Sequence, residues 1–305
     1  MKTNPYPLPL CIALLFGVGA SSPAHAQQAY PTAEEAASAL VDALGTTAAD
    51  KARLSALLGS NWQDLVPEGG VDRADVDAFL QQYRQAHRIN TPMVGKASFL
   101  VVGKDNWAFP IPLAKGPNGW AFDLKAGAEE IRIRRIGRNE LAALQSAMAY
   151  NDAQMDYAEI DHDGDGVLEY AQKFISTNGT HDGLFWADDD SGDISPLGPL
   201  FGDAAPGGDW HGYQFRILDA QGPSAPGGAY GYRLGDNMSR GFALIAWPSK
   251  YGDTGVMSFM ISHDGEVFEK DLGPQGASVV RAMKAFDPDS SWEVAAPDAT
   301  VAGRK

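Results

Sequence analysis

The spacing of apolar residues changes near Ile131, and this change divides the chain into two parts. Upstream, helical spacing over residues 32–89 gives way to short strand-like stretches over residues 97–124. Downstream, one long helical stripe is followed by strand-like alternation over residues 213–270. Helices that precede antiparallel strands, instead of alternating with them, indicate an α+β fold. We therefore expect an N-terminal α+β unit over 27–125 and a second unit over 126–293, with a disordered tail over 294–305.

Local signals place the elements of the first unit. Thr32 with Glu35 forms a capping box, and Leu40, Val41 and Leu44 follow on one helix face. The pair Asn118-Gly119 is typical of a hairpin turn. The expected helices are 32–44, 49–58 and 71–87, and the expected strands are 97–102 and 119–124. The strand-like segment 107–113 contains Pro110 and Pro112, so we expect an edge strand or an irregular segment there.

The second unit is expected to pack a long helix on an antiparallel meander. Asn139 is the expected cap of a helix over about 139–158. Leu141, Leu144, Met148 and Met155 lie three, four and seven residues apart, which predicts one apolar stripe on that helix. Asp264-Gly265 predicts the last hairpin turn. Strands are expected at 213–218, 229–234, 241–248, 255–262 and 266–270, and a short helix at 277–285.

Residues 1–26 have the pattern of a secretory signal peptide. Lys2 precedes the apolar stretch 8–20, and Ala24-His25-Ala26 places small residues where signal peptidase cleaves. The alternative is a membrane anchor, but the stretch is too short to span a bilayer. We predict cleavage after Ala26 and a periplasmic or secreted protein. Cleavage also removes Cys11, the single cysteine, so the mature chain would depend on core packing without a disulfide.

The negative net charge of the chain disfavours two classes of binding partner. The formal net charge is −15, which disfavours nucleic acids and anionic lipid surfaces because both require clustered cations. No second apolar run approaches the length of a membrane span. We therefore expect a soluble product that binds neither nucleic acid nor membrane.

The stretch 161–169, DHDGDGVLE, is typical of an EF-hand-like calcium loop. Carboxylates at loop positions 1, 3 and 5 can converge on one hard cation, a glycine at position 6 allows the turn, and position 7 offers a carbonyl. The expected ligands are Asp161, Asp163, Asp165 and Val167, closed by Glu169 or Gln172. Because position 12 is Gln172 and not glutamate, weak binding is expected. The alternative is a solvated turn, which is also how we interpret the acidic run 188–193.

Other residues could bind ligands or catalyse a reaction. Arg134, Arg135 and Arg138, with Arg132, could hold a carboxylate or phosphate, or could pair with nearby acids for structural reasons. His211 beside Asp209 could act as a general base, and His181 is a further candidate. The alternative for His211 is a hydrogen-bonded residue at a strand start. The sequence contains no nucleophile elbow, zincin motif, P-loop or dinucleotide-binding glycine motif, so we assign no catalytic residue.

Several stretches resemble one bacterial family. They are NWAFPIPL at 106–113, RRIGRNEL at 134–141, SPLGPL at 195–200, HGY at 211–213, QGPSAPGGAY at 221–230 and YGDTGV at 251–256. Together they resemble the domain of unknown function 2950 family of exported bacterial proteins, over about residues 30–292. The resemblance implies export and one full-length unit, and it brings no activity.

A more distant resemblance concerns the second unit. A helix, a variable loop and a meander ending in Thr254-Gly255-Val256 and Asp264-Gly265 are similar to the globular heads of type IV pilins and type II secretion pseudopilins. Some of those heads hold calcium. The chain departs from them because residues 27–125 replace the apolar half of the pilin helix, so the resemblance implies a soluble accessory.

These observations lead to one functional prediction with two alternatives. We expect an exported, non-enzymatic binding or assembly module, stabilised by calcium, whose partner is an envelope protein or glycan. The first alternative is an envelope hydrolase that uses His211, Asp209 or His181. The second is a small-ligand carrier, because the helices-then-sheet order of the first unit is similar to that of cone-shaped ligand-binding folds.

Overall fold

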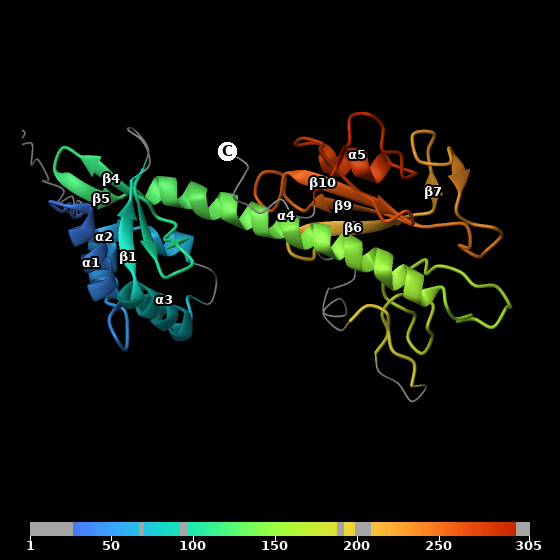
Figure 1. Ribbon diagram of the computed structural model, residues 1–305, viewed down its shortest axis with the longest axis horizontal. Helices are drawn as coiled ribbons and strands as arrows, with labels where there is room; N and C mark the ends of the chain where they lie inside the picture. The colour runs from blue at the N-terminus through green and yellow to red at the C-terminus, as the bar shows by residue number, and fades with distance from the viewer. Residues whose placement is uncertain (1–26, 67–69, 92–96, 188–191, 199–208, 297–305) are drawn as a thin grey trace, which may run out of the picture. The chain divides into compact units, whose positions relative to one another are not determined.

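The computed structural model describes residues 27–66, 70–91, 97–187, 192–198 and 209–296, which form two compact units (Figure 1). The first unit ends at Ala128 and the second begins at Glu129. Each has its own hydrophobic core, as expected for separate domains. The predicted signal peptide, 1–26, and the final residues, 297–305, lie outside the described residues.

The helices of the first unit begin at the capping residues in the sequence. The Thr32 hydroxyl accepts a hydrogen bond from the backbone N–H of Glu35 at 3.1 Å. The Asp50 carboxylate accepts two from the next helix. Such bonds satisfy donors that a helix N-terminus leaves without partners. The helices are α1 (Ala33–Leu44), α2 (Lys51–Leu58), the 3-10 turn η1 (Trp62–Leu65) and α3 (Arg73–Gln85).

The strands of the first unit form two small antiparallel groups. They are β1 (His87–Asn90), β2 (Phe99–Val102), β3 (Trp107–Ala108), β4 (Leu113–Gly116) and β5 (Gly119–Phe122). One sheet has the order β1-β2-β3, and β4 pairs with β5 in a hairpin. The expected edge or irregular segment 107–113 has a strand only at Trp107–Ala108 before β4 begins at Leu113. Pro110 and Pro112 lie in the irregular part between the two strands, because proline cannot donate to a ladder. A Cβ on Gly119 would lie 2.3 Å from the Tyr30 carbonyl oxygen, so glycine is required at that hairpin position.

The long helix α4 (Leu124–Tyr157) starts earlier than predicted. It begins after Asp123, whose carboxylate accepts a hydrogen bond from the backbone N–H of Ala126 at 2.9 Å. The predicted start at Asn139 was therefore wrong. Residues 129–138 lack an apolar stripe. Their arginines and glutamates are compatible with a helix, but they do not form a pattern that predicts one.

The predicted core-facing stripe of α4 was also wrong. Of its four members only Leu144 is buried, whereas Leu141, Met148 and Met155 are exposed. The face against the sheet instead carries small residues and tyrosines: Ala143, Ala147, Tyr150, Ala153 and Tyr157. Alanines allow the helix backbone to approach the sheet closely, and the tyrosines fill the remaining space.

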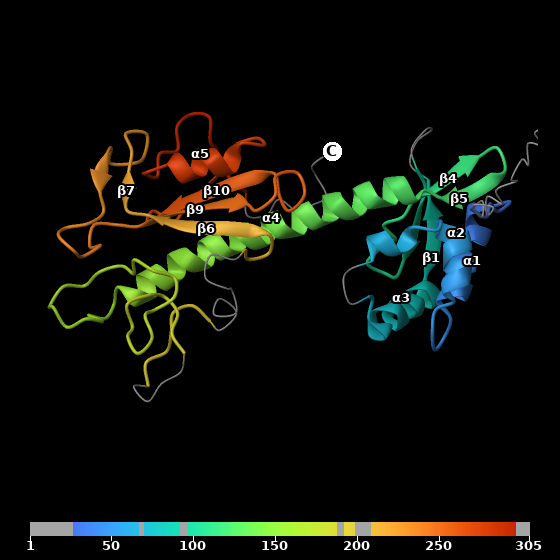
Figure 2. The ribbon, with the colours of Figure 1, turned by 180° about the vertical axis from the view of Figure 1, so that it is seen from behind.

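The second unit contains the predicted antiparallel meander. Its sheet has the order β12-β11-β10-β9-β6, with antiparallel pairing throughout. All six residues of β9 are buried, because α4 covers one face of the sheet and α5 the other (Figure 2). The elements are β6 (Tyr213–Leu218), β7 (Ala220–Gln221), β8 (Tyr230–Gly231), β9 (Ala243–Pro248), β10 (Met257–Ser262), β11 (Val267–Asp271), α5 (Gly276–Ala282) and β12 (Glu293–Val294).

The predicted α+β class and the helix packed on a meander are confirmed. The hairpin turn at Asp264-Gly265 joins β10 to β11 as expected. Among the described residues, no helix combines the length and the continuous apolar character that a membrane crossing needs.

Candidate functional site

The acidic loop 161–169 follows α4 directly and is folded around its own aspartates. The two carboxylate oxygens of Asp161 accept hydrogen bonds from the backbone N–H groups of Gly164 at 2.8 Å and Gly166 at 2.9 Å. Asp163 accepts one from the N–H of Asp165, and Asp165 accepts one from the N–H of Val167. These side-chain-to-backbone bonds curl the loop around a common centre.

The three aspartates of this loop converge. One carboxylate oxygen from each of Asp161, Asp163 and Asp165 lies within 4.8 Å of the other two. Two oxygens that bind one calcium ion can be separated by at most about 5 Å, so the spacing fits a shared ion. The hydrogen bonds from the Gly166 and Gly164 N–H groups lower the pKa of Asp161 and keep it charged.

The other expected ligands anchor the loop to a distant segment. Glu169 accepts a hydrogen bond from the backbone N–H of Met238 at 3.0 Å, and Gln172 donates to the Asp236 carbonyl oxygen at 2.7 Å. The Val167 side chain is exposed. The structure thus brings the three aspartates together and directs Glu169 and Gln172 toward 236–238.

Asn237 is a site residue that sequence reasoning missed. Its side-chain amide donates to the second carboxylate oxygen of Asp165 at 2.6 Å. A contact between residues this far apart in sequence produces no local signal. Its existence follows only from the fold, which places the turn around Leu234 and Asn237 beside the loop.

The arginine cluster mainly fixes α4 to the loop between β9 and β10. Arg132 donates to the Gly252 carbonyl oxygen, and Arg135 forms an ion pair with Asp253. Arg134 pairs with Glu130 along the helix at 2.7 Å. Arg138 is exposed on α4. These contacts favour the structural interpretation for Arg132 and Arg135.

Two further side chains of α4 continue this attachment. The Asn139 amide donates to the Thr254 carbonyl oxygen at 2.8 Å, and one Glu140 oxygen accepts from the backbone N–H groups of Val256 and Met257 at 3.0 Å. The stretches RRIGRNEL and YGDTGV therefore meet in space. Their polar residues attach the helix to the sheet through hydrogen bonds.

His211 lies in a turn next to this attachment of α4 to the sheet. Trp210 and Tyr213 exchange backbone hydrogen bonds, and the two residues between them, His211 and Gly212, have φ values of 51° and 73°. Two positive φ values define a type I′ turn. A Cβ on Gly212 would lie 2.7 Å from Cβ of Thr254, which explains the glycine. His211 is exposed at this turn.

Two neighbouring hollows lie beside α4 in the second unit. His211 lines one of about 430 Å³, and His162 with Trp186 lines another of about 320 Å³. Asp156 and Pro196 border both. These hollows lie next to the aspartates of the helix end.

The remaining histidine candidates have separate surroundings. The His181 ring stacks on Trp186 at 4.2 Å, and its Nδ1 lies 3.6 Å from a carboxylate oxygen of Asp193. Asp209 is exposed. His162 stacks on Tyr157, and burial lowers its pKa. Of the acidic run 188–193, residues 188–191 lie outside the described residues.

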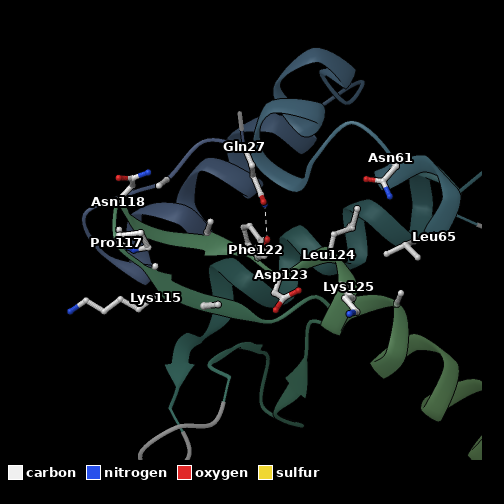
Figure 3. Close-up of a pocket in the computed structure, with 16 residues that line it drawn as sticks. Gln27, Asn61, Leu65, Lys115, Pro117, Asn118, Phe122, Asp123, Leu124 and Lys125 are labelled. Carbon is white, nitrogen blue, oxygen red and sulfur yellow. Dashed lines mark hydrogen bonds between the residues drawn. The ribbon is translucent and has the colours of Figure 1, made fainter. Parts of the chain in front are cut away.

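The first unit contains a larger pocket of about 780 Å³ (Figure 3). The β4–β5 hairpin, with Lys115 and Asn118, lies on one side, and Asn61 with Leu65 lies on the other. The start of α4 lies between them and contributes Asp123, Leu124 and Lys125. The volume falls in the range of small-molecule sites.

Gln27 holds the inner end of this pocket together. Its side-chain amide donates to the Phe122 carbonyl oxygen at 2.6 Å (Figure 3). It also donates to the Leu57 carbonyl oxygen at 2.8 Å. The sequence predicted ligand carriage by this unit only from the order of its elements. The lining residues are separated along the chain and have no shared motif.

Comparison with known proteins gives one match. The family model described as "Protein of unknown function (DUF2950)" matches residues 27–295. The comparisons with curated proteins and with solved structures gave no match. The resemblance to pilin heads is thus not confirmed and remains a prediction.

Proposed function

Because the chain belongs to the DUF2950 family, whose description carries no activity, we propose a function from its own residues. The protein is an exported, non-enzymatic binding module of the cell envelope, stabilised by calcium, and its partner is an envelope protein or glycan. The observation that carries the proposal is the convergence of Asp161, Asp163 and Asp165. Export is supported by the signal-peptide pattern, since the family match begins at Gln27, directly after the predicted cleavage site.

Calcium fits the loop for electrostatic reasons. Three carboxylates this close repel one another, and a bound divalent cation removes that repulsion. The ion would also stiffen the link to 236–238, because Asp165 and Glu169 already bond to Asn237 and Met238. With no glutamate at position 12, affinity in the range of extracellular modules, on the order of 10⁻⁴ M, is expected.

Thermal unfolding with added calcium tests this proposal. At a hundredfold excess over Kd, binding to the folded state adds about 2.7 kcal/mol, or about 5–10 °C in Tm for a unit of this size. Magnesium should raise Tm less, because it tolerates an irregular oxygen shell poorly. An unchanged Tm of the wild type in calcium would show that the loop is only a turn.

Two variants make the calcium experiment specific. Asp163→Ala should abolish the calcium-dependent rise in Tm and leave the fold unchanged without calcium, because Asp163 is exposed. Asp105→Ala is the matched control, since Asp105 is an exposed aspartate in a turn of the first unit. It should keep the full response to calcium.

Small-ligand carriage is a second candidate function, and the pocket of Figure 3 supports it. Leu65 and Leu124 offer apolar contact, and Lys115 and Lys125 provide positive charge in a chain whose net charge is −15. Such a lining suits a small amphipathic molecule with one anionic group.

Calorimetry with octanoate and octanol tests this candidate. Octanoate should bind more tightly than octanol, since the two differ in the anionic group. Lys125→Ala should weaken octanoate binding, whereas Lys104→Ala, at an exposed lysine that does not line the pocket, should not. Equal binding of the two compounds would contradict the role of the lysines.

The surroundings of the histidines favour a binding module over a hydrolase. His181 stacks on Trp186, and His162 bonds to the Tyr157 carbonyl oxygen at 3.1 Å. His211 occupies a tight turn. A general base should lie within hydrogen-bond reach of the group it activates, whereas the rings of His162 and His181 are engaged with Tyr157 and Trp186.

A further inference from the structure

The exposed side of α4 carries large apolar side chains. Leu141, Met148 and Met155 recur every seven residues and are 38%, 42% and 42% exposed, and Ile133 at the basic end is 50% exposed. Leu141, Met148 and Met155 lie on the side away from Ala143, Ala147 and Tyr150, which pack on the sheet. One apolar residue per heptad is half of the repeat by which two helices pack on each other.

Charged residues flank this stripe in a self-complementary order. Arg134 and Arg138 lie toward the start of α4, and Asp152 and Asp156 lie toward its end. Arg134 and Asp152 are separated by about five full helical turns, and so are Arg138 and Asp156. All four side chains therefore lie on one flank, positive at one end and negative at the other.

We propose that two copies of the chain associate through α4, antiparallel and around a two-fold axis at Gln145. In such an arrangement each helix presents the same surface to its partner in the opposite direction. Gln145 lies midway between residues 138 and 152, and also midway between residues 134 and 156. One register therefore places both arginines opposite aspartates of the second copy.

The same register aligns the apolar stripe. Leu141 comes next to Met148 of the second copy. A parallel pairing would instead place arginines beside arginines and aspartates beside aspartates, which is unfavourable. Two chains of net charge −15 repel each other overall, so association requires a local match of this kind.

Charge reversal tests the register. Arg138→Asp or Asp152→Arg alone should raise the dimer Kd about tenfold, because each change affects two symmetry-related contacts. The double variant should return to within about threefold of the wild type. Residues 138 and 152 are about 21 Å apart along one helix, so a rescue cannot arise within one copy.

Sedimentation of residues 27–305, at constant calcium concentration, measures the mass of the species in solution. The wild type should shift from one copy toward two as its concentration rises. Met148→Asp should remain a single copy. Val279→Asp, at a residue of α5 with a matching 43% exposure, should behave like the wild type.

Three results would overturn the proposal. The first is a wild-type protein that keeps the mass of a single copy up to millimolar concentration. The second is a dimer that Met148→Asp leaves intact, because the interface would then lie elsewhere. The third is a double charge variant as weak as the single variants, because the antiparallel register would then be wrong. Circular dichroism of each variant verifies that α4 remains folded.

Discussion

Asp182 is nearly half exposed, and yet it organises a whole turn. Its carboxylate accepts hydrogen bonds from the backbone N–H of Thr177 at 2.7 Å and from the Thr177 hydroxyl at 2.9 Å, and it pairs with Lys173. Partial burial alone would raise the pKa of Asp182, but the bonds from Lys173 and Thr177 outweigh it and lower the pKa far below its usual value. The charged form is therefore the one that stabilises the turn.

The lowered pKa of Asp182 predicts that the stability difference between the wild type and a variant without this carboxylate depends on pH. The pKa of Asp182 is lower in the folded state than in the unfolded state. The ionised carboxylate therefore adds its full free energy to folding above the usual aspartate pKa of about 3.9, and this stabilisation is lost as pH falls below that value. Asp182→Asn should thus unfold more easily than the wild type at pH 7, and the difference should shrink toward pH 2. Urea unfolding across this range measures it. A difference that stays constant with pH would mean that shape, and not charge, determines the role of Asp182.

At the scale of elements, local signals predicted what depends on neighbouring residues. The Thr32 cap, the Asp264-Gly265 turn and strand β6 lie where the sequence places them, because each depends on short-range chemistry. The buried face of α4 could not be predicted in this way. Its orientation is set by Ala147 and Tyr150 against the sheet, and a hydrophobicity pattern gives more weight to Leu141 and Met148.

The candidate site shows the same division between local and long-range information. The spacing within the loop predicted that Asp161, Asp163 and Asp165 could share a centre, and one oxygen of each lies within 4.8 Å of the others. Whether they bind calcium stays a prediction. The contribution of Asn237 depends on a long-range turn, so the sequence could not indicate it.

Enlarging the buried face of α4 should be far more costly than changing its exposed face. Ala147 is 1% exposed, so Ala147→Leu would overfill the contact with the sheet and lower the free energy of unfolding by about 1–3 kcal/mol. Met148→Leu on the exposed side should change it by less than about 0.5 kcal/mol. Urea unfolding of both variants measures the contrast. The opposite order would mean that the predicted stripe, and not the alanine face, packs on the sheet.

At the scale of the whole molecule, the described residues from Gln27 onward make contacts within the first unit. The Gln27 side chain bonds to Leu57 and Phe122, and the Gln28 backbone N–H donates to the Ala56 carbonyl oxygen at 2.8 Å. Tyr30 then pairs with Trp120. The residues directly after the predicted cleavage site thus belong to the fold of the first unit, which makes the position of the cut important for its packing.

We expect the exported protein to begin at Gln27. Signal peptidase requires small residues at the two outer positions of Ala24-His25-Ala26 and tolerates variation between them. Ala26→Lys should therefore block cleavage and leave the apolar stretch 8–20 attached, which would hold the product at the membrane. His25→Lys introduces the same charge one residue earlier and should be processed normally. Intact-mass measurement of the exported protein distinguishes the variants, and a wild-type product that still begins at Met1 would contradict cleavage after Ala26.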